Sequence, residues 1–300
     1  MARQLQQGKK EKRSHSRSFY RAIALLLGVV ILSEPLIAKR AIAQPAPTEQ
    51  KTRDRNARIS QLLNQATELN RQGTRESRIK AIALYEEALI IVREIGDRNG
   101  EAVILSSIGV NYSLLNEYDK AIKYHKQSLV IAQELKKPEL EAIILSALGG
   151  SYSALGDRQL SINFFTQAVS RLRASNNPKF EAATLQLIGN QYLGSGETQK
   201  ALDFYNQALD IQTMQKDPIA QAETLSSVGE VYIRLSETDK ALNSYQQALK
   251  LQTGNTLIEA NNLYLIHYLY TSSGEISKAL DYLNQTLINR QRDRYRISTH

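Results

Sequence analysis

The chain repeats itself at an interval of 40 residues, and such a repeat limits the folds that it can adopt. Glycine recurs at this interval and a tyrosine stands three residues after each glycine, at Gly109, Gly149, Gly189 and Gly229 and at Tyr112, Tyr152, Tyr192 and Tyr232. Small residues form a further series with the same interval, at Ala81, Ala121, Ser161, Ala201 and Ala241. Several series that share one interval indicate a tandem array, in which each unit buries its apolar face against its neighbours.

Each unit has the pattern of two helices. Apolar or small residues are spaced by three and four in the first helix, as in Leu105, Ile108, Gly109 and Tyr112, and again in the second, as in Ala201, Leu202, Tyr205, Ala208 and Leu209. This spacing places them on one helical face. Pro138, Pro178 and Pro218 lie between units, where one helix must stop and the next begin. The sequence predicts an all-α chain of six helix pairs, at about 57–91, 101–132, 141–173, 181–213, 221–252 and 259–290.

The repeated residues resemble those of a known family. Most copies contain Gly-x-x-Tyr, with a leucine four residues before the glycine, followed by Ala-x-x-x-aromatic-x-x-Ala. This combination resembles the tetratricopeptide repeat (TPR), in the 40-residue variety of kinesin light chains and many bacterial arrays. The resemblance implies a right-handed α-solenoid over 57–290, whose first helices line a concave groove that binds peptides. The first copy departs from the pattern with Ala66 in place of glycine, and the third with Ser161 in place of alanine.

The first 43 residues have the features of a secretory signal peptide. Basic residues between Lys9 and Arg21 precede an apolar run over 22–32, and Ala41 and Ala43 stand at −3 and −1 of a cut before Gln44. Eleven apolar residues are too few to cross a bilayer, which needs about 20. We predict cleavage between Ala43 and Gln44, a flexible linker over 44–56, and a periplasmic or secreted protein. The alternatives are a cytosolic protein with an apolar N-terminal helix, and a leader retained as a membrane anchor.

The composition argues against several classes of site. The net charge is +8, but residues 1–43 carry nine Lys or Arg and two Asp or Glu, so 44–300 carries only about +1. A protein that binds nucleic acid concentrates positive charge on its folded surface, so no such partner is expected. The basic tail, 291–300, is short. With no cysteine and four separated histidines, we predict no metal, no cofactor and no catalytic residue.

One stretch, residues 261–274, has the residue types of an active site, with His267 between Tyr264, Tyr268 and Tyr270. Its place in the repeat argues otherwise, because His267 occupies the position of Gly229 and its equivalents. No carboxylate or nucleophile accompanies the histidine. We interpret the stretch as the first helix of an atypical last repeat.

Residues opposite the packing stripe of each first helix are the candidates for a partner-binding groove. These are Val103, Ser106, Val110 and Ser113 in the second copy; Ile143, Ser146, Gly150 and Ser153 in the third; Gln186, Asn190 and Leu193 in the fourth; Glu223, Ser226, Glu230 and Arg234 in the fifth; and Asn261, Tyr264 and Tyr268 in the sixth. The predicted lining is small and neutral at its centre, then acidic and aromatic. Only Asn190 fits the set of lysine, arginine and asparagine residues with which some family members hold a carboxylate terminus, so a partner of that kind is not expected.

These features together predict an exported, non-catalytic scaffold or adaptor that binds a protein or peptide segment. The alternatives are a peptide-sensing regulatory protein, and a stand-alone relative of the arrays that accompany caspase-like (CHAT) protease domains. The membrane is expected to be contacted only through an uncleaved leader. Apolar residues late in the last repeat, such as Leu280 and Leu283, lack a following helix to cover them. This end is therefore expected to dock a second copy of the chain, another protein, or the basic tail folded back onto it.

Overall fold

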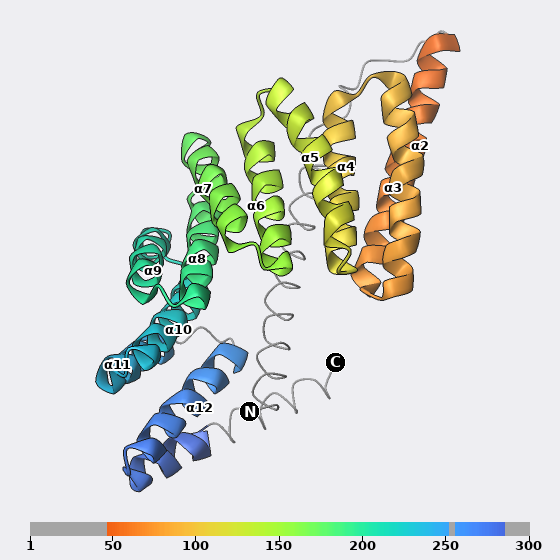
Figure 1. Cartoon of the computed structure of the whole chain (residues 1–300). Helices are drawn as coiled ribbons and strands as arrows, with labels where there is room; N and C mark the ends of the chain where they lie inside the picture. Colours follow the sequence, from red (N-terminus) through yellow and green to blue (C-terminus); the bar gives the residue numbers. More distant parts are fainter. Residues whose placement is uncertain (1–46, 252–255, 286–300) are drawn as a thin grey trace. The chain divides into compact units, whose positions relative to one another are not determined.

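The helical architecture predicted from the repeat is present in a computed structural model that describes residues 47–251 and 256–285 (Figure 1). The chain divides into two compact units, Met1–Ser175 and Asn176–His300. The first contains α2 (Pro47–Gln72), α3 (Arg75–Ile95), α4 (Arg98–Leu114), α5 (Tyr118–Glu134), α6 (Pro138–Leu155) and α7 (Arg158–Ala174). The second contains α8 (Pro178–Ser195), α9 (Thr198–Met214), α10 (Pro218–Arg234), α11 (Thr238–Lys250), α12 (Thr256–Ser272) and a helical segment at 276–285.

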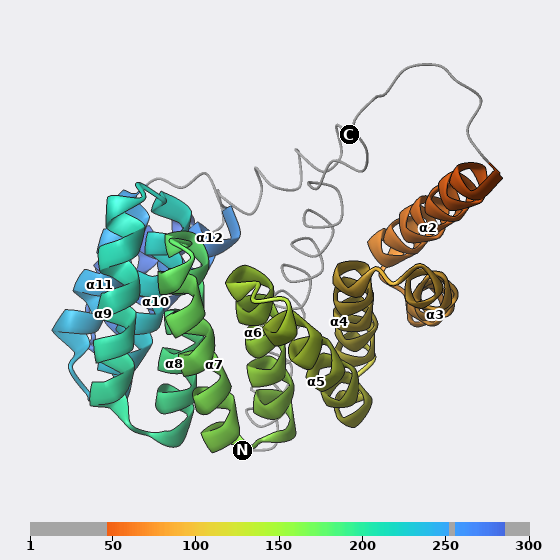
Figure 2. The ribbon, with the colours of Figure 1, turned by 90° about the horizontal axis from the view of Figure 1, so that it is seen from above.

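Within each unit, every helix packs against the next one along the chain, so that the helices form a series of antiparallel pairs (Figures 1 and 2). The second, third and fourth helix pairs differ from their predicted bounds by one to three residues, whereas the first begins ten residues before its predicted start. The predicted ends of the fifth and sixth pairs, at 252 and 290, lie outside the described residues. No strand occurs in the part of the chain that the structure describes. Within the described ranges, no helix is both long and apolar enough to span a bilayer.

The helix boundaries follow from local chemistry. The three prolines at which a helix boundary was predicted are the first residues of α6, α8 and α10. They are Pro138, Pro178 and Pro218. Proline is well tolerated at this position because the first helical N–H groups have no partner within the helix. Asp217 caps α10, since its carboxylate accepts a hydrogen bond of 3.1 Å from the backbone N–H of Ala220. Helices α6 and α8 end at glycines of positive φ, Gly156 at 88° and Gly196 at 84°.

The glycine series allows the two helices of a pair to approach closely. A Cβ atom on Gly149 would lie 2.6 Å from the Phe165 ring, and one on Gly189 would lie 2.6 Å from the Tyr205 ring. These rings are almost fully buried, at 1% and 0% exposure. Any side chain larger than hydrogen would therefore force the helices apart.

We expect Gly149→Ala to destabilise the first unit by about 1–3 kcal/mol, the usual cost of overpacking a filled core. The higher helix propensity of alanine would offset at most about 1 kcal/mol of that cost. Urea unfolding followed by circular dichroism measures the change. Gly194→Ala, at an exposed position of α8, is the matched control and should be neutral or stabilising. Equal effects of the two substitutions would contradict the close-approach explanation.

The tyrosines that recur every 40 residues also have a packing role. Tyr112 stacks on Tyr124 with ring centroids 5.5 Å apart, and the ammonium of Lys120 lies 5.1 Å from the Tyr112 centroid. Lys120 also pairs with Glu117 at 2.7 Å. The same arrangement joins Tyr192, Phe204, Lys200 and Glu197 in the fourth pair. In these two pairs the aromatic stack and the cation fasten the first helix to the second.

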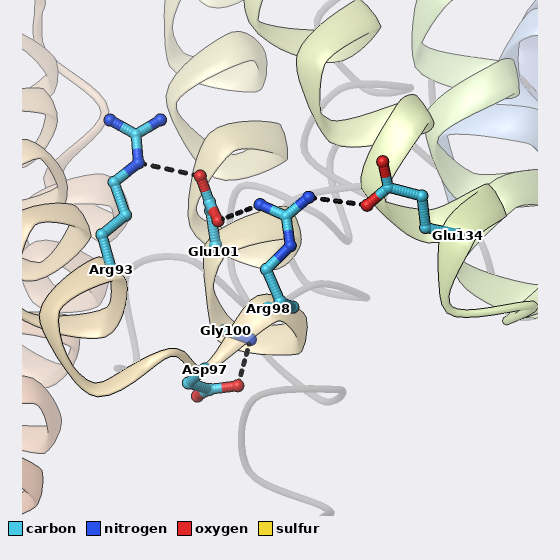
Figure 3. Close-up of polar contacts among 6 residues, drawn as sticks. All are labelled: Arg93, Asp97, Arg98, Gly100, Glu101 and Glu134. Atoms are coloured by element: carbon cyan, nitrogen blue, oxygen red, sulfur yellow. Dashed lines mark hydrogen bonds and ion pairs between the residues drawn. The ribbon is translucent and has the colours of Figure 1, made fainter.

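An ion-pair cluster at the start of α4 joins three helices of the first unit (Figure 3). Glu101, whose side chain is only 9% exposed, accepts hydrogen bonds from Arg93 at 2.8 Å and from Arg98 at 2.5 Å. Arg98 also pairs with Glu134 of α5 at 2.6 Å. Burial alone would raise the pKa of the Glu101 carboxyl, but the bonds and charges of the two arginines outweigh it and lower this pKa. The carboxylate therefore stays ionised in a nearly buried place.

One predicted boundary needs correction, and three other predictions concern residues that the structure does not describe. Residues 47–56, predicted as a flexible linker, are the first turns of α2, which is a helix of 26 residues. The polar sequence of this segment hid the helix, because it lacks the apolar spacing that indicates an amphipathic helix. The predicted signal peptide over 1–43, the cleavage site before Gln44 and the basic tail over 291–300 lie outside the described residues.

Candidate protein-binding surface

In the first unit, most of the predicted groove residues are not exposed. The side chains of Val103, Ser106, Val110 and Ser113 on α4 are between 0% and 3% exposed. On α6, Ser146 and Gly150 are buried, whereas Ile143 and Ser153 are partly exposed. The prediction that these six buried residues offer an open binding surface is therefore not met in this structure.

Contacts between first helices explain part of this burial. Helix α4 touches α3 and α5, its neighbours along the chain, and it also touches α6. At the last of these contacts the hydroxyls of Ser113 and Ser151 lie 3.2 Å apart. The spacing of apolar residues within one helix pair does not reveal this additional contact, because it involves the first helix of the next repeat. Some residues of α4 that were predicted to face a groove are therefore packed between α4 and α6.

In the second unit, the predicted positions are mostly open. Asn190 on α8, Glu223, Glu230 and Arg234 on α10, and Asn261, Tyr264 and Tyr268 on α12 are exposed, and Gln186 and Ser226 are partly exposed. Leu193 is the exception, at 5% exposure, because it belongs to the core cluster formed with Tyr205 and Val228. We call the exposed set on α8, α10 and α12 the first-helix face of the second unit.

Polar contacts hold these three helices together. Helix α10 contacts both α8 and α12. The guanidinium of Arg234 donates a hydrogen bond of 3.2 Å to the backbone carbonyl of Leu193 on α8, and it pairs with Glu230 at 3.0 Å. On the other side, Ser226 Oγ lies 2.8 Å from the side-chain amide oxygen of Asn262 on α12. Arg234 and Ser226 therefore join neighbouring repeats as well as lying at the surface.

His267 has a structural partner. Its Nδ1 lies 2.7 Å from the backbone carbonyl of Ala279, in the helical segment that follows α12. Because a carbonyl oxygen only accepts, Nδ1–H is the donor of this bond. Tyr270 is buried and stacks on Tyr282 with centroids 5.6 Å apart. The interpretation of both residues as packing elements of the last repeat agrees with these contacts. Tyr264 and Tyr268 are different, since they are 52% and 59% exposed.

Two polar features of the structure were not singled out in the sequence. The Glu101 cluster was missed, although Glu101, Glu141 and Glu181 have the 40-residue interval that could have revealed it. Glu141 also pairs with an arginine, Arg171 of α7, at 2.7 Å. His125 was treated as an isolated histidine, although it occupies the position of Phe165, Tyr205 and Tyr245. Burial lowers the pKa of His125 to about 3. Among the described residues, no group of three metal-binding side chains occurs.

Comparison with known proteins identifies the family. Models of the tetratricopeptide repeat match residues 75–134, 140–214 and 224–257, which together span more than half of the chain. The chain belongs to the tetratricopeptide repeat family. The matched segments cover most of the helices from α3 to α11, so the TPR assignment rests on the same residues as the 40-residue interval. Among curated proteins, none matches this chain.

Solved TPR structures share the fold at low sequence identity. BtubC (BKLC) from P. vanneervenii is 15% identical, with a TM-score of 0.61, over 80% of this chain and 92% of that one. Aspartyl phosphate phosphatase F from Bacillus subtilis is 14% identical, with a TM-score of 0.64, over 83% of this chain and 76% of that one. The quorum sensor NprR from B. thuringiensis is 16% identical, with a TM-score of 0.56, over 81% of this chain and 78% of that one. These likenesses establish the fold of the TPR array.

Proposed function

We propose that the chain is an exported, non-catalytic TPR module that binds a protein or peptide segment on the first-helix face of the second unit. The observation that carries the proposal is the exposure of Tyr264 and Tyr268. The two exposed rings lie one helical turn apart and so form a patch, and tyrosine is enriched at protein interfaces. The corresponding positions of α10 carry Ser226 and Glu230, so the repeat itself does not require an aromatic residue there.

The TPR fold supports a protein or peptide partner, because its first helices offer a row of equivalent positions that a long segment can contact together. A peptide-sensing role is the second candidate, and the likeness of the fold to the quorum sensor NprR favours it. Self-association is a further proposal, supported by Ile276 and Leu280, which are 55% and 52% exposed on the last helical segment. Gel filtration at increasing protein concentration distinguishes it from binding to another protein.

Affinity capture from a native extract tests the binding surface. The full chain is compared with a Tyr264→Ser, Tyr268→Ser variant, after circular dichroism has established that both fold. We expect the variant to lose a partner that the unmodified chain retains. Met214→Ser, which removes an apolar side chain that is 72% exposed on α9, is the matched control and should retain it. A partner held equally by all three chains would place the binding surface elsewhere.

Export is tested separately. The protein purified from its native cells should begin at Gln44, as determined by mass spectrometry of the N-terminal peptide. Cleavage by signal peptidase requires small residues at −3 and −1, so Ala43→Arg should prevent it. A mature protein that retains Met1 or Ala2 as its first residue would contradict the proposed cleavage.

A further inference from the structure

We infer that the partner segment carries arginine or lysine side chains, which the first-helix face of the second unit binds between carboxylates on α10 and tyrosines on α12. This inference rests on the proposed function and adds the chemical class of the partner. It follows from the types of residue that are exposed on this face and from the contacts that place them next to one another.

The carboxylates come from one face of α10. Glu223 and Glu230 are seven residues apart, which is about two helical turns, and both are exposed. Ser226 and Ser227, which lie between them on the same face, are small and partly exposed. An extended segment that passes along α10 can therefore approach both carboxylates without a bulky side chain in between.

The tyrosines come from the neighbouring helix. Tyr264 and Tyr268 are one turn apart on α12, so their rings lie on the same face of that helix. Contact between Ser226 and Asn262 fixes α12 against the part of α10 that lies between the two glutamates. The exposed rings and the carboxylates therefore lie on two helices of the second unit that are in contact with each other.

Arg234 is the one exposed cation that the face itself contributes at the predicted positions, and it is already engaged. It pairs with Glu230 and also donates to the carbonyl of Leu193. The side chains of Arg234 and Glu230 are 46% and 55% exposed, and ion pairs that are this exposed are weak. An incoming guanidinium or ammonium group can therefore share Glu230 without first breaking a strong interaction.

A basic segment fits this surface better than the alternatives. The carboxylates would repel an acidic segment, and an apolar segment would displace water from them without adding a charged or hydrogen-bonding group. The faces of tyrosine rings attract cations, and arginine in particular stacks on them. Arginine and lysine can therefore interact favourably with both the carboxylates of α10 and the tyrosine rings of α12, whereas other side chains interact favourably with one of these sets at most.

Selection from a random library of displayed 12-residue peptides tests the inference and separates it from the proposed function. The bait is the full chain. We expect selected peptides to be enriched in arginine and lysine, and we expect this enrichment to disappear with a Glu223→Gln, Glu230→Gln bait. The matched control is Asp203→Asn, Asp210→Asn, which removes the same charge from exposed positions of α9 and should select the same peptides as the unmodified chain.

A synthetic copy of the best selected peptide then gives affinities by fluorescence anisotropy. Its Kd should rise about tenfold or more when its basic residues are replaced by glutamine, and the same replacement should matter little for the Glu223→Gln, Glu230→Gln chain. Tyr264→Phe, Tyr268→Phe should keep the affinity, because the ring faces remain, whereas Tyr264→Leu, Tyr268→Leu should lower it. Enrichment of peptides without basic residues would overturn the inference but not the proposed function. Failure to enrich any peptide would count against both.

Discussion

The first unit is expected to lose about 2–3 kcal/mol of stability between pH 6 and pH 4 through the protonation of His125 alone. This ring is 0% exposed, and neither of its nitrogens has a hydrogen-bond partner among the described residues. Burial therefore lowers the pKa of His125 to about 3, below the value of about 6.5 in an unfolded chain. In that window the unfolded state binds the proton and the folded state does not.

The sign of the effect follows from this difference. A histidine with a lowered folded pKa contributes its full stability above about pH 6.5 and loses it as the pH falls towards 3, by at most about 1.4 kcal/mol per pH unit. Urea unfolding at a series of pH values measures the slope. Buried carboxylates with a lowered pKa, such as Glu101, also stabilise the fold less in acid. Their contribution is lost at lower pH than that of His125.

His125→Phe isolates the contribution of the histidine. Phenylalanine occupies the equivalent position in α7, where Phe165 packs against Gly149 as His125 packs against Gly109. The variant should fold, and its stability should vary much less between pH 6 and pH 4 than that of the unmodified chain. An unchanged pH dependence in the variant would show that other groups cause the acid sensitivity.

Tyr205→Ala is expected to destabilise the second unit by about 3–5 kcal/mol, the range for removing a large aromatic side chain from a core. Tyr205 is 0% exposed and packs in one cluster with Leu193, Leu202 and Val228. Its ring also fills the space that the missing side chain of Gly189 leaves. Alanine would leave a cavity that the helices on either side cannot easily close, because glycine offers no atoms to fill it.

Tyr205→Phe is the control for the ring itself. The hydroxyl of Tyr205 donates a hydrogen bond of 2.6 Å to the side-chain oxygen of Asn190, which is exposed and can bond to water instead. We expect this substitution to cost about 1 kcal/mol or less. Denaturant unfolding of the three chains gives both values. A loss under about 1 kcal/mol for Tyr205→Ala would mean that the ring is not a main support of this unit.

The sequence by itself determined the helix pairs and the residues that pack within each pair. The positions of the glycines and of Pro138, Pro178 and Pro218 were enough, because helical spacing and proline geometry act over a few residues. The same reasoning failed at residues 47–56, where α2 begins without an apolar stripe. Local patterns indicate an element only when the pattern is present in the element itself.

Only the tertiary structure decided which residues of the first helices are exposed. Val110 and Glu230 occupy equivalent positions in the repeat, yet Val110 is 1% exposed and Glu230 is open to solvent. The 40-residue interval could have aligned His125 with Phe165, but the complete burial of His125 and its lowered pKa follow from the helices around it. Exposure and pKa depend on atoms contributed by residues far away in the chain, and a 40-residue repeat does not encode how those residues differ from one copy to the next.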